Sequence, residues 1–230
     1  MILEMTRPVQ GGLRQERKLD TVSNNLANAD TTGFKKDSVS FDEKFRARIN
    51  KDYSQGAIVE TGNPLDLALS GDGFFKIETS EGIKYTRNGN FTLDNNGILV
   101  DQNGNPVMGQ GGAIAIGGEN IGQGLGINRA GEISIGGEII DTLDIVTFAD
   151  LKKLKREGAN LFSYEGETTR EIAADQTSVE QKALEKANVT VVEEMARMID
   201  YHRMFETYTK SMMTFDELDN KAINDVGKLR

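Results

Sequence analysis

The residue types that most often carry chemistry are scarce in this chain. Its 230 residues include no cysteine, no tryptophan and one histidine, His202. Without cysteine the chain has no thiol nucleophile, disulfide or thiolate metal site, and a single histidine cannot form a cluster of imidazole ligands. His202 lies on the apolar stripe of a predicted helix, where we expect it to pack or to lie in an interface. The sequence therefore predicts a protein that is not an enzyme and that uses no cofactor or metal.

Two loop patterns resemble ligand-binding loops, and neither has the required residues. Asp101-x-Asn103-x-Asn105 begins like a calcium-binding loop, but Pro106 and Gly112 occupy the positions that need a glycine and a bidentate glutamate. The glycine-dense middle of the chain contains neither a phosphate-loop lysine nor the spacing of the dinucleotide-binding fingerprint. Turn formation explains these patterns better than ligand binding.

Charge and hydropathy exclude two further classes of partner. The chain has 27 basic and 36 acidic residues, so its formal net charge is −9, which disfavours binding to nucleic acid. Nowhere do ~18 apolar residues run together, so we expect no direct membrane insertion. The first residues of the chain lack the apolar stretch of a signal peptide, and we expect no cleaved signal.

Glycine placement divides the chain into helical ends and a strand-forming middle. Residues 13–28 place Leu13, Leu19, Val22 and Leu26 at helical spacing and predict a short amphipathic helix. From about residue 58 to residue 165 the apolar period becomes two. Three Asn-Gly pairs in this zone predict tight hairpins in which both turn residues have positive φ.

The C-terminal zone predicts one long helix. Thr190 and Glu193 have the spacing of a capping box, and no glycine or proline interrupts the sequence from there to Val226. Roughly 36 residues make a helix about 55 Å long, which is more than a small β domain requires. Its apolar stripe needs a partner helix, either the N-terminal helix or a helix of another copy. The stripe consists of Val191, Met195, Met198, His202, Phe205, Tyr208, Met212, Phe215, Leu218, Ala222 and Val226. We therefore predict an α+β fold in which long terminal helices pair as a coiled-coil-like domain and the middle forms a β-rich domain.

Three parts of the sequence resemble the bacterial flagellar rod and hook proteins. Residues 19–35, LDTVSNNLANADTTGFK, are similar to the N-terminal signature of that family. Residues 65–75 (LDLALSGDGFF) with 85–91 (YTRNGNF), and residues 184–199 (LEKANVTVVEEMARMI), look like its middle and C-terminal segments and occur in the family's order. Residues 1–12 depart from the family's usual helix start. Within the family, the short chain, the modest β domain and the methionine-rich last helix resemble the FlgF type more than the FlgG type.

The resemblance implies a structural subunit of the flagellar basal-body rod, which polymerises through its terminal helices into the axial shaft that transmits torque from motor to hook. It implies an inner helical domain, made from the N-terminal helix and linker (1–55) and the C-terminal segment with the long helix (178–230). The β-rich outer domain would span 56–177. The family is exported through the flagellar type III apparatus without a cleaved signal and assembles in the periplasmic part of the basal body. The implied partners are other copies of the chain, neighbouring rod proteins and that export apparatus.

Two alternatives to a basal-body rod subunit stay open on the sequence. One is a distal-rod or hook-type axial protein, and the other is a secreted β-rich binding module that the helices oligomerise. For a rod subunit we expect the terminal helices to order on assembly, so that proteolysis of the monomer leaves a fragment of about residues 56–176. The predicted assembly interface consists of Leu13, Leu19, Val22, Asn24, Asn25, Leu26, Asn28, Gly33, Phe34, Met195, Met198, Ile199, His202, Phe205, Tyr208, Met212 and Phe215.

Overall fold

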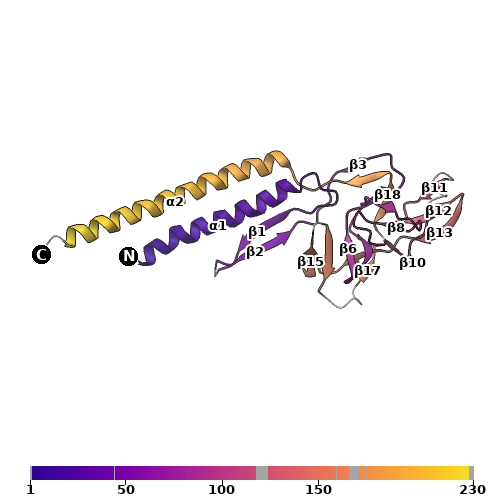
Figure 1. Cartoon of the computed structure of the whole chain (residues 1–230), viewed down its shortest axis with the longest axis horizontal. Helices are drawn as coiled ribbons and strands as arrows, with labels where there is room; N and C mark the ends of the chain where they lie inside the picture. The colour runs from indigo at the N-terminus through magenta and orange to yellow at the C-terminus, as the bar shows by residue number, and fades with distance from the viewer. Residues whose placement is uncertain are drawn as a thin grey trace. The chain divides into compact units, whose positions relative to one another are not determined.

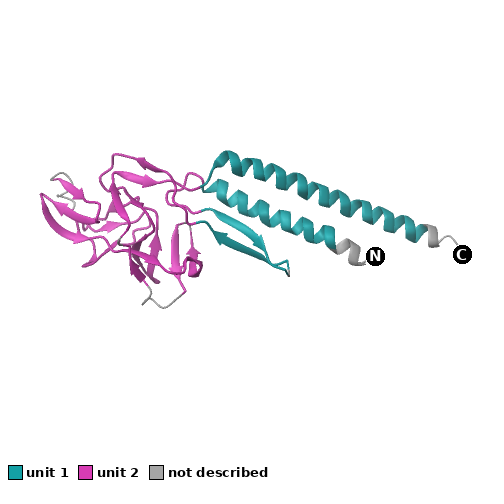
Figure 2. Ribbon diagram, turned by 180° about the vertical axis from the view of Figure 1, so that it is seen from behind, with its two compact units in different colours: residues 1–28, 36–52, 189–230 teal, residues 29–35, 53–188 magenta. Residues whose placement is uncertain are grey.

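The chain divides into two compact units (Figure 2). Unit 1 combines Met1–Asn28, Lys36–Asp52 and Val189–Arg230, and unit 2 combines Ala29–Lys35 with Tyr53–Asn188. The computed structural model describes residues 2–43, 45–117, 124–158, 160–165, 171–174 and 176–227, so part of the predicted glycine-dense stretch and the side chain of Val226 lie outside the description. The predicted division into 1–55 and 178–230 for the inner helical domain and 56–177 for the outer β-rich domain stays a prediction.

Unit 1 contains two antiparallel helices that lie side by side (Figure 1). Helix α1 spans Ile2–Ala27 and helix α2 spans Val191–Gly227. Gly11 near the start of α1 lies against Tyr208, whereas Asn25 near its end bonds Glu194 at the start of α2. The long C-terminal helix is therefore confirmed, and its partner within the chain is α1.

A β-hairpin packs against α1 within the same unit. It consists of β1 (Asp37–Phe41) and β2 (Ala47–Lys51), and Asp37 pairs with Lys51 in the register of the strands. The guanidinium of Arg14 lies 4.1 Å from the centre of the Phe45 ring and 5.3 Å from that of Phe41. These cation–π contacts attach the hairpin to a face of α1 that the apolar pattern does not identify.

Helix α1 begins at Ile2, so the prediction of a short helix from Leu13 was wrong. Pro8 lies inside the helix although it cannot donate a backbone hydrogen bond. A Cβ built on Gly11 would lie 2.4 Å from Cε1 of Tyr208, so glycine is what allows the tyrosine ring to approach this closely. Because a helix gains most of its stability from packing, contact with α2 offsets the weak helix propensity of this segment.

Unit 2 is built from short antiparallel strands around a six-stranded sheet of order β15-β16-β6-β5-β14-β17. Its strands are β5 (Phe74–Thr79), β6 (Gly82–Thr86), β14 (Ile145–Phe148), β15 (Leu154–Glu157), β16 (Leu161–Tyr164) and β17 (Glu171–Ala173). A three-stranded sheet consists of β11 (Leu125–Ile127), β12 (Glu132–Ile135) and β13 (Glu138–Thr142). The 3₁₀ helix η2 spans Leu151–Lys153.

Four two-stranded pairs complete the described part of unit 2. Two of them are local, β7 (Thr92–Leu93) with β8 (Leu99–Val100) and β9 (Met108–Gly109) with β10 (Gly112–Ala113). The other two join distant parts of the chain, β3 (Ile58–Glu60) with β19 (Ala183–Glu185) and β4 (Leu67–Ser70) with β18 (Ser178–Gln181). The residues just before α2 thus complete the β unit.

The central strand β5 separates two apolar cores, because successive side chains point to opposite faces of a strand. Phe75 joins the larger core and meets Phe91 edge to face, with ring centres 5.1 Å apart. Phe74 joins the smaller core with Tyr85 and lies 5.8 Å from the ring centre of Phe162. Phe74 and Phe75, which are adjacent in the sequence, are therefore both buried, one in each core.

The turns at the Asn-Gly pairs differ from the prediction. Among the described residues, positive φ outside glycine occurs only at Phe45 and Lys182, so none of the three asparagines takes the predicted conformation. At the middle pair the Asp94 carboxylate accepts hydrogen bonds from the backbone amides of Asn96 and Ile98, each at 2.8 Å. The side chain of Asp94 shapes this turn, a contribution that dipeptide preference ignores.

Helices at the chain ends and strands between them confirm the predicted α+β fold. The coiled-coil geometry of the helix pair stays a prediction. Over the described residues, neither helix has a stretch that is long and apolar enough to cross a membrane.

The close approach at Gly11 can be tested against its neighbour. In Gly12→Ala the new Cβ meets Met212 Cε at 3.8 Å, an ordinary contact, so helix propensity should stabilise the protein by about 0.5–1 kcal/mol. In Gly11→Ala the new Cβ overlaps the ring of Tyr208, and we expect a net loss of about 1–3 kcal/mol. Unfolding in urea, monitored by the loss of the helical circular dichroism signal, measures the stability of both variants. Equal stability of the two variants would show that the contact does not constrain α1.

Candidate functional site

The segments that carry the sequence resemblance meet in two buried polar clusters, one in each unit. The first, in unit 2, is the ionic cluster of Lys35, Arg87 and Glu185. Glu185 Oε1 accepts a hydrogen bond from Lys35 Nζ at 2.7 Å, and Glu185 Oε2 accepts one from Arg87 Nη1 at 3.4 Å. The side chains of Lys35 and Glu185 are 1% exposed and that of Arg87 is 3% exposed. One residue from each resembling segment therefore contributes a fully buried charge.

Backbone carbonyls accept further hydrogen bonds from both cations of the ionic cluster. Lys35 Nζ also donates to the carbonyl of Ser54 at 2.8 Å, and Arg87 Nη2 donates to that of Gly71 at 2.6 Å. Burial lowers the pKa of the Arg87 guanidinium, and the attraction of Glu185 opposes that shift. Glu185 thus bonds both cations, and the carboxylate of Asp72 adds a second attraction for Arg87.

Gly33 and Phe34 of the predicted interface are buried beside the ionic cluster. The Gly33 amide donates to the carbonyl of Glu185 at 2.8 Å. Gly33 has φ of +68°, and a Cβ placed on it would lie 2.5 Å from backbone atoms of Arg87 and Asn88. The Arg156 guanidinium lies 4.2 Å from the centre of the Phe34 ring. The turn after α1 is thus an internal part of unit 2.

The second polar cluster, the Asn25 cluster in unit 1, consists of Asn25, Asp37, Glu194 and Arg197. Asn25 Oδ1 accepts from the Asp37 amide at 2.8 Å, and Asn25 Nδ2 donates to the Asp37 carbonyl at 2.8 Å and to Glu194 Oε2 at 3.2 Å. Arg197 Nη1 donates to Glu194 Oε1 at 2.9 Å. Both Asn25 and Glu194 are buried. One amide side chain thus joins the end of α1, the first strand of the hairpin and the first turn of α2.

Two other asparagines of the predicted interface terminate α1. The backbone amide of Asn28 donates to the carbonyls of Asn24 and Asn25 at 3.2 Å, and Asn28 Nδ2 donates to the Asn24 carbonyl at 2.9 Å. The side chain of Asn24 is exposed. These bonds satisfy carbonyls that the helix end would otherwise leave without partners.

The predicted apolar stripe divides into two faces. In α1, Val22 is buried and Leu19 and Leu26 are half-buried, but Leu13 is 56% exposed. In α2, some of the predicted side chains are half-buried and others are open to solvent. The half-buried set is Met198, Phe205, Tyr208, Met212 and Phe215, and the exposed set is Met195, Ile199, His202 and Leu218. A list that steps alternately by three and four residues covers both faces, which is why the sequence pattern did not separate them.

Sequence reasoning missed the charged members of both clusters. Lys35, Arg87 and Glu185 stand in the three resembling segments, yet the predicted interface contains none of them. No local pattern marks these residues, because Glu185 is followed by a second charged residue, Lys186, and Lys35 is followed by Lys36. The predicted role of Glu193 as part of a capping box was also incomplete, because its carboxylate pairs with Arg197.

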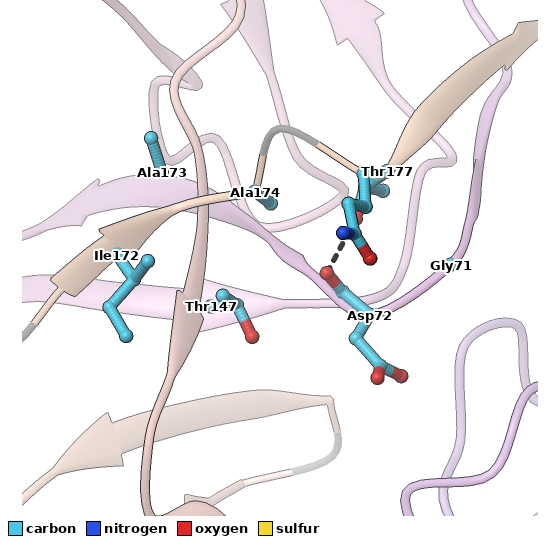
Figure 3. Close-up of a pocket in the computed structure, with 8 residues that line it drawn as sticks. Gly71, Asp72, Thr147, Ile172, Ala173, Ala174 and Thr177 are labelled. Atoms are coloured by element: carbon cyan, nitrogen blue, oxygen red, sulfur yellow. Dashed lines mark hydrogen bonds between the residues drawn. The ribbon is translucent and has the colours of Figure 1, made fainter.

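Loops and hollows elsewhere in the described residues show no comparable chemistry. The Asp101 carboxylate accepts from the backbone amides of Asn103 and Asn105 at 2.8 Å, as a turn requires. A hollow in unit 2 is lined by Asp72, Thr147, Ile172 and Thr177 among others, and its only drawn bond runs from Thr177 to the Asp72 carbonyl (Figure 3). No group of three or more histidine and carboxylate side chains in the described ranges could hold a metal.

Removal of the carboxylate tests the ionic cluster. Glu185→Gln keeps the shape of the side chain and removes the carboxylate that bonds the two buried cations Lys35 and Arg87, so we expect a loss of about 3–5 kcal/mol in the free energy of unfolding of unit 2. Glu180→Gln, on the exposed side of β18, is the matched control and should change stability by less than about 0.5 kcal/mol. Urea unfolding followed by tyrosine fluorescence measures both. A Glu185→Gln protein as stable as the control would contradict the assigned role.

Gly33 can be tested against a glycine with the same backbone conformation. Gly62 has φ of +81°, and a Cβ built on it would have no atom within 4 Å. Gly62→Ala should therefore lower the free energy of unfolding by only about 1 kcal/mol, which is the cost of alanine in a left-handed conformation. Gly33→Ala adds an overlap with the backbone at Arg87 and should cost clearly more, about 3 kcal/mol or above. Thermal unfolding of the two variants gives the comparison, and equal melting temperatures would refute the close approach.

Family models match three parts of the chain. The Flagella basal body rod protein model matches residues 11–35, the Flagellar hook protein FlgE/F/G D1 domain model matches residues 68–135, and the Flagellar basal body rod FlgEFG protein C-terminal model matches residues 180–225. Each model contains one member of the ionic cluster, Lys35, Arg87 and Glu185 in turn. The matched parts therefore meet in space at that cluster.

Curated relatives match over nearly the whole chain. The flagellar basal-body rod protein FlgF of Caulobacter vibrioides is 33% identical over 93% of this chain and 93% of its own. The flagellar basal-body rod protein FlgG of Bacillus subtilis is 32% identical over 97% of this chain and 99% of its own. FlgF of Mesorhizobium japonicum is 31% identical over 92% of each chain. The chain belongs to the flagellar basal-body rod protein family, in its FlgF/FlgG-like part.

Proposed function

We propose that this protein is a structural subunit of the bacterial flagellar basal-body rod that polymerises through its terminal helices. The observation that carries the proposal is the apolar surface left on both helices of unit 1 after they have packed against each other. Leu13 on α1 is exposed, as are Met195 and Ile199 on α2. Large apolar side chains that remain open on one side of a helix indicate a further packing partner.

The predicted interface residues then fall into two groups with different roles. Val22, Met198, Phe205, Tyr208, Met212 and Phe215 hold the two helices of one chain together. Leu13, Met195, Ile199 and His202 face away from that contact, so we assign them to contacts between subunits. Asn25, Gly33 and Phe34 act inside the chain, where they fix the segments that lead into and out of the helices.

The proposed partners are other copies of the chain and neighbouring rod proteins, in the periplasmic part of the basal body. Torque from the motor would pass to the hook through the packed helices, because closely packed interiors resist compression. Export through the flagellar type III apparatus without a cleaved signal belongs to the same proposal. Its support is the family membership.

Within the family, we assign the chain to the FlgF type. Its alignment with FlgF of Caulobacter vibrioides spans 230 positions. The alignment with FlgG of Bacillus subtilis takes 267 positions although this chain has 230 residues, so that relative carries insertions. The single compact β unit fits the shorter type.

Thiol labelling tests the proposed contacts, because the chain contains no cysteine of its own. Ile199→Cys should react quickly with a maleimide in the monomer and at least about tenfold more slowly in purified basal bodies, since a neighbouring subunit covers it. Met198→Cys, one residue away on the inner face, should react slowly in both states. Absence of the chain from basal bodies would overturn the rod assignment. Equal reactivity of Ile199→Cys in both states would overturn the assigned interface alone.

A further inference from the structure

The three Asn-Gly pairs of unit 2 have a chemical property that their turns do not use. An asparagine that precedes glycine can lose its side-chain nitrogen, because glycine has no Cβ to hinder attack by its own backbone nitrogen. The reaction requires that this nitrogen reach the side-chain carbon, so local packing decides which pair reacts. The pairs are Asn88-Gly89, Asn96-Gly97 and Asn103-Gly104.

Packing holds the first pair in place. Gly89 is buried, and a Cβ placed on it would overlap the carbonyl oxygen of Leu67. The Gly89 carbonyl also accepts a hydrogen bond from the Leu67 amide at 3.0 Å. Asn88 is half-buried, and its Oδ1 accepts from the amide of Asn90 at 3.1 Å. Both the backbone and the side chain of this pair are therefore restrained.

The other two pairs lie in turns of the same construction and differ in exposure. In each turn, the carboxylate of Asp94 or Asp101 accepts a hydrogen bond at 2.8 Å from the backbone amide of the asparagine two residues later. The glycine amide donates to the carbonyl of the same aspartate, at 3.0 Å from Gly97 and at 3.1 Å from Gly104. Gly97 is buried, whereas Asn103 and Gly104 are both exposed. A Cβ built on Gly104 would meet no atom of a non-adjacent residue within 4 Å, so the third pair has the most room to react.

We propose that Asn103 is a site of spontaneous deamidation in the folded protein. The Gly104 nitrogen loses its proton and bonds to Cγ of Asn103, the bond between Cγ and Nδ2 breaks, and the side-chain nitrogen leaves as ammonia. Water then opens the cyclic imide at one of its carbonyls, which gives aspartate or isoaspartate. One water is consumed for each ammonia released, and no electrons are transferred. The inference concerns the single chain and stands or falls separately from the proposed function.

The modification would place a second carboxylate beside a buried one. Asp101 is buried, and its Oδ2 accepts a hydrogen bond from Asn103 Nδ2 at 3.4 Å. The deamidated residue has no donor for this bond and adds a negative charge, and like charges repel at short range. The same Asp101 carboxylate bonds the amide of Asn105 at 2.8 Å and its Nδ2 at 2.9 Å. Deamidation should therefore loosen the turn between β8 and β9.

Peptide mapping by mass spectrometry tests the site on the folded full chain, kept for days at mildly alkaline pH. Deamidation at Asn103 should be at least about tenfold faster than at Asn88, with Asn96 between them, because packing restrains the first pair. In guanidinium chloride the three rates should agree within about threefold, since glycine follows each asparagine. The proposal is wrong if Asn103 of the folded chain deamidates no faster than Asn88.

The variant Asn103→Asp carries the charge of the aspartate product and tests its effect on the turn. The backbone amides of residues 103 and 105, which bond Asp101, should exchange with deuterium about tenfold faster than in the wild type. Gln110→Glu adds the same charge at an exposed position and should leave both amides unchanged. Wild-type exchange in Asn103→Asp would overturn the predicted loosening of the turn, whereas the rates of deamidation decide the site itself.

Discussion

The structure depends on one buried carboxylate that two cations share. Glu185 bonds Lys35 from the segment after α1 and Arg87 from the β unit, and all three side chains are withdrawn from water. A buried ion pair adds little stability compared with a well-packed apolar replacement, but its geometry is hard to change because a lost partner leaves a buried charge. The cluster therefore determines which segments pack together, and it adds less to the stability of that packing. Lys35 and Glu185 thus join the first and the last segment of unit 2 at this position.

Within unit 1 the Asn25 cluster has a similar role, since one amide side chain bonds both the hairpin and the first turn of α2. Beyond it, α1 and α2 pack on a single face, where Gly11 allows close contact with Tyr208. The opposite faces keep Leu13, Met195 and Ile199 in solvent. Buried polar groups thus fix the contacts between segments of one chain, while the helices keep apolar surface exposed. This combination suits a protein that assembles with further subunits.

Periodicity and turn chemistry predicted the fold class and the long C-terminal helix, because these features depend on local sequence. Residues 2–12 of α1 were not predicted, since Pro8 and the two glycines read as helix breakers until Tyr208 is placed against them. The prediction for the Asn-Gly turns was wrong for a similar reason, because the Asp94 side chain, which lies outside the dipeptide, bonds the backbone of the turn. The ionic cluster could not be predicted from sequence patterns, because Lys35 and Glu185 are 150 positions apart and no local pattern indicates that their side chains form a buried ion pair. Gly33, Phe34 and Asn25 were identified as important, but the structure places them inside the chain.

The most direct test is a structure of the assembled basal body at a resolution that shows side chains. The account predicts that Lys35 and Arg87 of each subunit contact Glu185 of the same subunit. It also predicts that Met198 faces α1 of its own chain, while Ile199 packs against a helix of a neighbour. Rods in which Glu185 bonds another subunit, or in which Ile199 faces open solvent, would contradict it.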